Sequence, residues 1–124
     1  MAIVLVVDDE PDIRNLLKTI IEKAGHAVHT ASDAGEAWAL LEKRPDIIFA
    51  DIDMPGETGV ELVLRLRDHA SCGAVPVIFV TAHHERAVPL LATGAGIVDV
   101  IDKPFKVERV LRSLETGLAG NPSA

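Results

Sequence analysis

The strongest constraint on the fold is an alternation that repeats five times along the chain. Short apolar runs are each followed by a longer segment in which apolar residues recur three and four positions apart. Short apolar runs are typical of buried strands, and the longer spacing is typical of helices with one buried face. The order predicts one α/β domain with a parallel sheet, because parallel strands need a crossover segment between them.

The predicted strands differ in composition, and this difference indicates their order in the sheet. They cover residues 2–7, 27–31, 46–50, 75–80 and 97–101. The first, third and fourth are almost wholly apolar, whereas the second and fifth mix polar and apolar residues. Strands buried on both faces belong at the centre of a sheet. The flavodoxin-like order 2-1-3-4-5 places all five strands accordingly, with a doubly wound set of five helices.

The first three predicted helices have recognisable ends. Pro11 suits the first turn of a helix, and Gly25 ends the same segment. Ser32 or Asp33 can cap the second helix. Thr58 opens a sequence with the spacing of a capping box, which predicts the start of the third helix.

The later part of the chain predicts one irregular helix and a short tail. The segment 84–95 contains Pro89 and Gly94, so we expect its helix to be short or to start late. No linker or repeat divides the chain. We therefore expect a single domain over residues 1–119 and a flexible tail over residues 120–124.

Composition argues against several classes of function. The net charge of −7 argues against a nucleic-acid-binding face, and the absence of Tyr argues against a base-stacking platform. The apolar runs are far shorter than the roughly 20 residues that cross a bilayer, and no basic region precedes the first of them. Cys72 is the single cysteine, so no internal disulfide can form. These features together predict a cytoplasmic protein.

Polar residues follow four of the five predicted strands. Asp8 and Asp9 follow the first strand, Asp51 the third, Thr81 the fourth and Lys103 the fifth. The carboxyl ends of parallel strands meet at one edge, and ligands of such sheets bind there at the switch point. In the order 2-1-3-4-5 that point lies between the first and third strands. The sequence therefore predicts a polar site at this edge.

The residue types at this edge favour phosphoryl chemistry. Two carboxylates about 5 Å apart repel by about 3 kcal/mol at an effective dielectric of 20, so a cation or a raised pKa must offset them. Clustered carboxylates suit Mg²⁺, and an ammonium or a hydroxyl suits a phosphoryl oxygen. Asp51 can itself act as a nucleophile and form an aspartyl phosphate. A lone Asp after a strand would ordinarily be a helix cap, but three at neighbouring strand ends exceed what a cap requires.

Other conspicuous residues have ordinary explanations. The side chain of Asp53, before Met-Pro-Gly, is by default a turn residue. His83 and His84 are adjacent on a predicted loop without zinc-ligand spacing, so a solvent-facing pair is expected. Trp38 has the spacing of a core or helix-surface residue, and Cys72 lies in a polar segment typical of an ordinary loop thiol.

Four segments together resemble a known family. "VLVVDDEPDIR", "DIDMPGETG", "VIFVTA" and "DKPF" are similar, in this order, to the receiver domain of bacterial two-component response regulators, over residues 2–118. The resemblance implies a signalling phosphoacceptor and not an enzyme, apart from its own phosphorylation and dephosphorylation. It implies a histidine kinase or phosphotransfer protein as donor. It also implies a target that is either another protein or a missing output domain.

The resemblance also assigns roles at the metal site. Asp51 matches the phosphoacceptor, and Asp9, helped by Asp8, matches the carboxylates that hold Mg²⁺. Asp53 stands where the family supplies a backbone carbonyl to the metal. The metal ligands implied are thus Asp8, Asp9, Asp51 and Asp53.

The resemblance assigns a second set of residues to the phosphoryl group. Thr81, Lys103 and the N–H of Ala82 match the residues that contact it, and the Lys103–Pro104 bond is expected to be cis. In one position the chain departs from the family. Val100 stands where an aromatic residue or His usually swings inward on activation. We therefore expect signalling to rely on loop 82–89 and movement of the fourth helix.

Two alternatives belong to other classes. "DID" is similar to the nucleophile pair of haloacid-dehalogenase phosphatases, which also use Mg²⁺, but that nucleophile sits on the first strand and not the third. A flavodoxin-type cofactor binder would share the fold. The acidic "DDEPD" loop would repel its phosphate in the absence of a metal.

Overall fold

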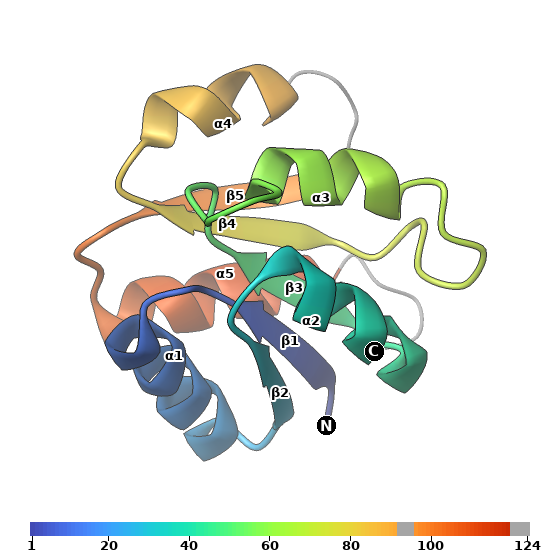
Figure 1. The fold of residues 1–124 in the computed structure, drawn as a ribbon. Helices are drawn as coiled ribbons and strands as arrows, with labels where there is room; N and C mark the ends of the chain where they lie inside the picture. The colour runs from blue at the N-terminus through green and yellow to red at the C-terminus, as the bar shows by residue number, and fades with distance from the viewer. Residues whose placement is uncertain (92–95, 120–124) are drawn as a thin grey trace.

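The fold is a five-stranded parallel sheet between two layers of helices (Figure 1). The structure, a computed structural model, describes residues 1–91 and 96–119. The strands are β1 (Ile3–Val7), β2 (Ala27–Ala31), β3 (Ile47–Ala50), β4 (Val77–Thr81) and β5 (Ile97–Asp102). Their order in the sheet is β2-β1-β3-β4-β5, as the sequence predicts.

The helices also follow the predicted pattern. They are α1 (Pro11–Lys23), α2 (Ala34–Leu40), α3 (Gly59–Leu66), α4 (His84–Leu91) and α5 (Val107–Ala119), and a short 3₁₀ turn, η1 (Leu41–Lys43), follows α2. Pro11 occupies the first turn of α1, Asp33 caps α2, and Thr58 forms the capping box of α3 with Glu61. The helix α4 begins at His84 and has 8 residues, so of the two expected alternatives it is short and does not start late. Gly94 and the tail 120–124 lie outside the described residues.

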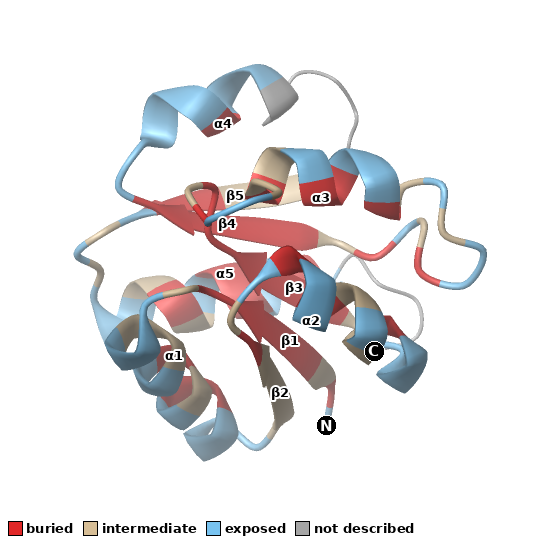
Figure 2. Cartoon of the chain, in the orientation of Figure 1, coloured by how far each residue is buried: buried red, intermediate tan, exposed pale blue. Residues whose placement is uncertain are grey.

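Each face of the sheet has its own apolar core (Figure 2). On one face α1 and α5 pack on alternate residues of the strands, including Val6, Phe49 and Ile78. On the other face α2, α3 and α4 pack on the intervening residues, including Ile48 and Phe79. Successive residues of a strand point to opposite faces, so each central strand contributes to both cores.

The burial of the strands explains their order. β3 and β4 are buried along their whole length and β1 along all but its first residue, whereas β2 and β5 are mostly half-buried. The central strands are covered by helices on both faces, and the outer strands have one free edge. The apolar strands are therefore central and the mixed strands are outer, as their compositions predict.

Candidate functional site

The ends of β1 and β3 bring two aspartates together at the carboxyl edge of the sheet. The ladder continues one step beyond each strand: Asp8 N–H donates to Ala31 O at 3.1 Å, and Asp51 N–H donates to Val7 O at 2.9 Å. The side chains of Asp8 and Asp51 therefore emerge from adjacent strands at the same level. Both residues are buried, with only 1% and 3% of their surface exposed.

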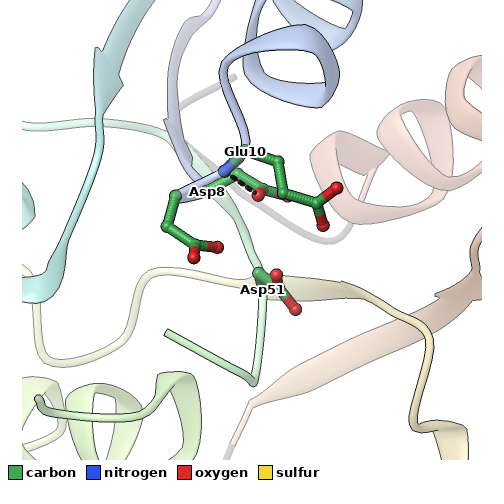
Figure 3. Close-up of side chains that lie close together, drawn as sticks. Asp8, Glu10 and Asp51 are labelled. Atoms are coloured by element: carbon green, nitrogen blue, oxygen red, sulfur yellow. Dashed lines mark hydrogen bonds between the residues drawn. The ribbon is translucent and has the colours of Figure 1, made fainter. Parts of the chain in front are cut away.

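Four acidic side chains gather at this edge. One carboxylate oxygen from each of Asp8, Asp9, Glu10 and Asp51 lies within 4.8 Å of the others. Figure 3 shows three of them close together, with the Glu10 N–H donating to Asp8 Oδ1 at 2.9 Å. The guanidinium of Arg14, on the first turns of α1, donates to Asp8 O at 2.8 Å and helps to hold the loop that carries them. Sequence reasoning missed Glu10, although it directly follows the acidic pair.

Lys103 reaches into this acidic group from the loop after β5. Its Nζ lies 3.0 Å from Asp8 Oδ2, 2.9 Å from Glu10 Oε1 and 3.1 Å from Asp51 Oδ2. The Lys103 side chain is only 11% exposed. One ammonium therefore faces three of the four carboxylates. The Lys103–Pro104 bond is cis, as predicted.

The environment raises the pKa values of Asp8, Asp51 and Lys103, which favours neutral carboxylates but a charged ammonium. Burial raises the pKa of Asp51, and the nearby charge of Asp8 adds to this effect, although Lys103 opposes it. Burial likewise raises the pKa of Asp8, against the Glu10 N–H and Lys103. Burial lowers the pKa of Lys103, but its contacts with Glu10, Asp8 and Asp51 outweigh burial and raise it overall. Positive charge is therefore in deficit at this edge.

The donor set fits a divalent cation. Asp9 Oδ1 is buried, and no residue in the described part of the chain gives it a hydrogen bond. An orphaned carboxylate oxygen beside two carboxylates with raised pKa values is the arrangement that a hard cation stabilises. Carboxylate oxygens of Asp8, Asp9 and Asp51 are the groups that would hold Mg²⁺, with Glu10 beside them.

Asp53 turns its side chain away from the acidic cluster. Its backbone N–H donates to Asp51 Oδ1 at 3.2 Å. Its carboxylate instead pairs with Arg86, and Asp53 Oδ2 lies 3.3 Å from His83 Nε2. The side chain is thus engaged by the start of α4, so only the backbone of Asp53 remains available to the site.

Thr81 lies at the end of β4 and faces the next loop. It is fully buried, and its Oγ1 accepts a hydrogen bond from His83 N–H at 2.9 Å. Within residues 1–91 and 96–119, no hydrogen bond joins Thr81 to Asp51. Ala82 is exposed. The backbone N–H of Lys103 donates to Thr81 O at 3.0 Å, which ties the ends of β4 and β5 together.

Gly59 allows a close backbone approach next to Asp51. The Gly59 N–H donates to Ile52 O at 2.9 Å, and a Cβ at this position would overlap the carbonyl oxygen of Asp51. The glycine that follows "MPGET" is therefore needed for contact between the start of α3 and the segment that carries Asp51.

Other predicted residues have structural roles outside this site. Cys72 lies in the loop between α3 and β4, as predicted, but it is buried against Leu41 O, and burial raises the pKa of its thiol. Because its neighbours in the sequence are polar, the sequence did not indicate that Cys72 faces the core. His83 and His84 are exposed, as expected, but each pairs with an aspartate. Trp38 packs at the core margin beneath the guanidinium of Arg65, 4.0 Å from the ring centroid.

Comparison with known proteins identifies the family. The family model described as response regulator receiver domain matches residues 4–115. The chain is 35% identical to Protein PilH of Pseudomonas aeruginosa over 121 residues, which is 97% of this chain and 100% of PilH. The chain therefore belongs to the family of response regulator receiver domains, whose members are signalling phosphoacceptors rather than catalytic enzymes.

Solved structures agree with this assignment. The chemotaxis protein CheY4 of Vibrio cholerae superimposes with a TM-score of 0.87 at 34% identity, over 95% of this chain and 99% of that one. The receiver domain of NtrX from Brucella abortus gives 0.85 at 34%, with the same coverage. Other relatives are longer: the chain spans 26% of NtrX from Azorhizobium caulinodans and 52% of PhoP from Escherichia coli. No helix within the described ranges is long and apolar enough to cross a membrane.

Proposed function

We propose that Asp51 accepts a phosphoryl group from a phosphohistidine of a histidine kinase or phosphotransfer protein. The observation that supports this most is the position of the Asp51 carboxylate, which is buried at the switch point between an acidic cluster and the Nζ of Lys103. An oxygen of Asp51 would attack phosphorus, and the bond from phosphorus to the donor nitrogen would break. The product is an acyl phosphate, which water later hydrolyses back to the carboxylate.

The surrounding residues would prepare Asp51 for this attack. The nucleophile must be ionised, and Lys103 favours the ionised form against the effect of burial. Carboxylates of Asp8, Asp9 and Asp51, together with the Asp53 backbone carbonyl, would hold Mg²⁺. When bound, Mg²⁺ supplies positive charge that offsets the negative charge of the transferring group.

The remaining groups would bind the phosphoryl oxygens after transfer. Lys103 already lies beside Asp51 and would pair with one oxygen. The Thr81 hydroxyl would turn from His83 to donate to another, and the Ala82 N–H would add a third donor. This change at the ends of β4 and β5 would alter the surface formed by β4, α4 and β5.

The family also suggests the extent of the domain, the compartment in which the protein works and the kind of target it acts on. We propose that residues 1–119 form the receiver and residues 120–124 a tail, and that the protein works in the cytoplasm. The chain matches PilH over its full length but only part of NtrX and PhoP. The phosphorylated form would therefore act either by binding another protein or by controlling an output domain.

The test is incubation with acetyl phosphate and Mg²⁺, followed by intact mass measurement. The wild type should gain one phosphoryl mass, and Asp51→Asn should gain none. Chelation of Mg²⁺ should prevent the gain, because the acidic cluster otherwise repels the donor. A matched variant, Asp68→Asn on the exposed surface, should behave as the wild type. A mass gain that persists in Asp51→Asn, or no gain with any donor, would refute the proposal.

A further inference from the structure

The first six residues of α4, 84–89, have few apolar contacts with the rest of the domain. Within residues 84–89 only Ala87 is buried, where it joins the core that contains Phe79 and Val100. Figure 2 shows most of the described surface of this helix as exposed. Val88 is 45% exposed, and Pro89 lies inside the helix. Apolar packing therefore fixes the first turns of α4 only through Ala87.

One ion pair of Arg86 and two His–Asp contacts hold the start of α4. The carboxylate of Asp53, on the loop after β3, pairs with the guanidinium of Arg86 and with His83. On the neighbouring side, His84 Nδ1 lies 3.0 Å from Asp102 Oδ1 at the end of β5. The first turn of α4 is thus in contact with the loop after β3 and with the end of β5, both at the carboxyl edge of the sheet.

One short route joins Asp51 to this first turn. Asp51 Oδ1 accepts the N–H of Asp53, whose carboxylate pairs with Arg86. A second hydrogen bond starts at the neighbouring strand end, where Thr81 Oγ1 accepts the N–H of His83, two residues past the end of β4. A phosphoryl group on Asp51 would change both hydrogen bonds, because it alters one acceptor and offers Thr81 a new one. Both changes would reach residues 83–86.

Val100 stands at the position where the family usually has an aromatic residue or His that swings inward on activation. Val100 is 4% exposed and belongs to the apolar core, and it has no polar group that could exchange a partner. A valine side chain is also too short to move between a buried and an exposed position. Coupling between Asp51 and α4 must therefore use other contacts.

We propose that Arg86 is the positioning residue that couples the phosphorylation of Asp51 to α4, through its ion pair with Asp53. The inference rests on the proposed function of Asp51. In the unphosphorylated protein Arg86 holds the first turn of α4 against the loop after β3. Movement of that loop on phosphorylation carries Arg86 and the helix with it, and the His83 contact supports the same link. An exposed ion pair contributes little to stability, but among residues 84–89 only Ala87 packs in the core and competes with it.

The experiment is amide NMR of the whole chain with and without saturating Mg²⁺ and beryllofluoride, a phosphoryl analogue. In the wild type, amides of residues 51–53 and of residues 83–88 should both shift. In Arg86→Gln, the site amides should still shift, whereas the response of residues 84–88 should fall to roughly half or less. Arg86→Lys, which keeps a cation, should retain most of the response.

Three controls separate the possible outcomes. Arg112→Gln, an exposed arginine on α5, should leave the response of α4 unchanged. Asp53→Asn should reduce it as Arg86→Gln does, and the double variant should reduce it no further, because both changes remove the same ion pair. An unchanged response of residues 84–88 in Arg86→Gln, with normal shifts at residues 51–53, would overturn this inference alone. Absence of any shift at residues 51–53 in the wild type would count against the proposed function itself.

Discussion

Two of the groups of carboxylate and cation in this domain, one at the carboxyl edge and one on β5, are built in opposite ways. At the carboxyl edge, burial raises the pKa values of Asp8 and Asp51 despite Lys103. On β5, hydrogen bonds from Arg109 lower the pKa of Asp99 to about 2, helped by Ser113 and against partial burial.

The geometry explains this difference. Arg109 Nη1 and Nη2 donate to the two oxygens of Asp99 at 2.6 and 3.0 Å, and the Ser113 hydroxyl donates to Asp99 Oδ2 at 2.6 Å. Asp99 is thus fully matched by donors. At the site, one ammonium is in contact with several carboxylates, so negative charge remains uncompensated. The Asp99 cluster stabilises the fold. The uncompensated negative charge of the acidic site lowers the stability of the fold, but it allows the site to bind positive charge.

The largest effect is expected at Gly59, which tests whether backbone packing, and not charge pairing, holds the acidic site together. Gly59→Ala should lower the free energy of unfolding by about 3 kcal/mol, because the new Cβ overlaps the backbone of Asp51. Urea denaturation measures the change. Gly35→Ala, at an exposed position of α2, is the matched control. Its Cβ would lie 3.3 Å from Asp33 Oδ1, a side-chain atom that can shift, so its effect should be much smaller than that of Gly59→Ala. Equal, small effects of the two substitutions would mean that the site tolerates displacement of its backbone.

A smaller effect is expected at Asp99, with a defined pH dependence. Asp99→Asn should lower the free energy of unfolding at pH 7 by about 1–2 kcal/mol, because it removes charge-assisted hydrogen bonds from Arg109. The folded pKa of Asp99 lies below its ordinary value of 3.8, so its contribution is complete above that value and is lost as pH falls through about 2. Denaturation from pH 7 to pH 2 should show the two proteins converge in acid. A difference independent of pH would show that charge is not its source.

The smallest effect, and one of opposite sign, is expected at Asp8. Asp8→Asn should raise the free energy of unfolding at pH 7 without Mg²⁺ by about 1 kcal/mol, because a buried charge with a raised pKa is removed. The folded state binds this proton more tightly than the unfolded state. The penalty in the wild type is therefore absent below pH 3.8 and grows as pH rises through the raised pKa. Urea titrations should show the advantage of Asp8→Asn disappear in acid, and destabilisation at pH 7 would contradict the comparison.

The sequence alone predicted most of the fold. Periodicity located all five strands and all five helices, and the polar content of β2 and β5 placed them at the edges. These features are local or depend only on burial, so they can be read from residue types. The ends of parallel strands must meet at one edge, and therefore Asp8, Asp51 and Lys103 could be brought together before any coordinates were known.

The tertiary structure decided what depends on contacts between distant residues. It showed that Cys72 faces the core, that Glu10 joins the acidic cluster, and that Asp53 pairs with Arg86. A side chain on a loop can point toward different neighbouring segments, and the sequence of the loop alone does not determine which of them it contacts. The strand ends determined where the chemistry lies, but only packing in three dimensions decided which charges remain uncompensated there and which helix is tied to them.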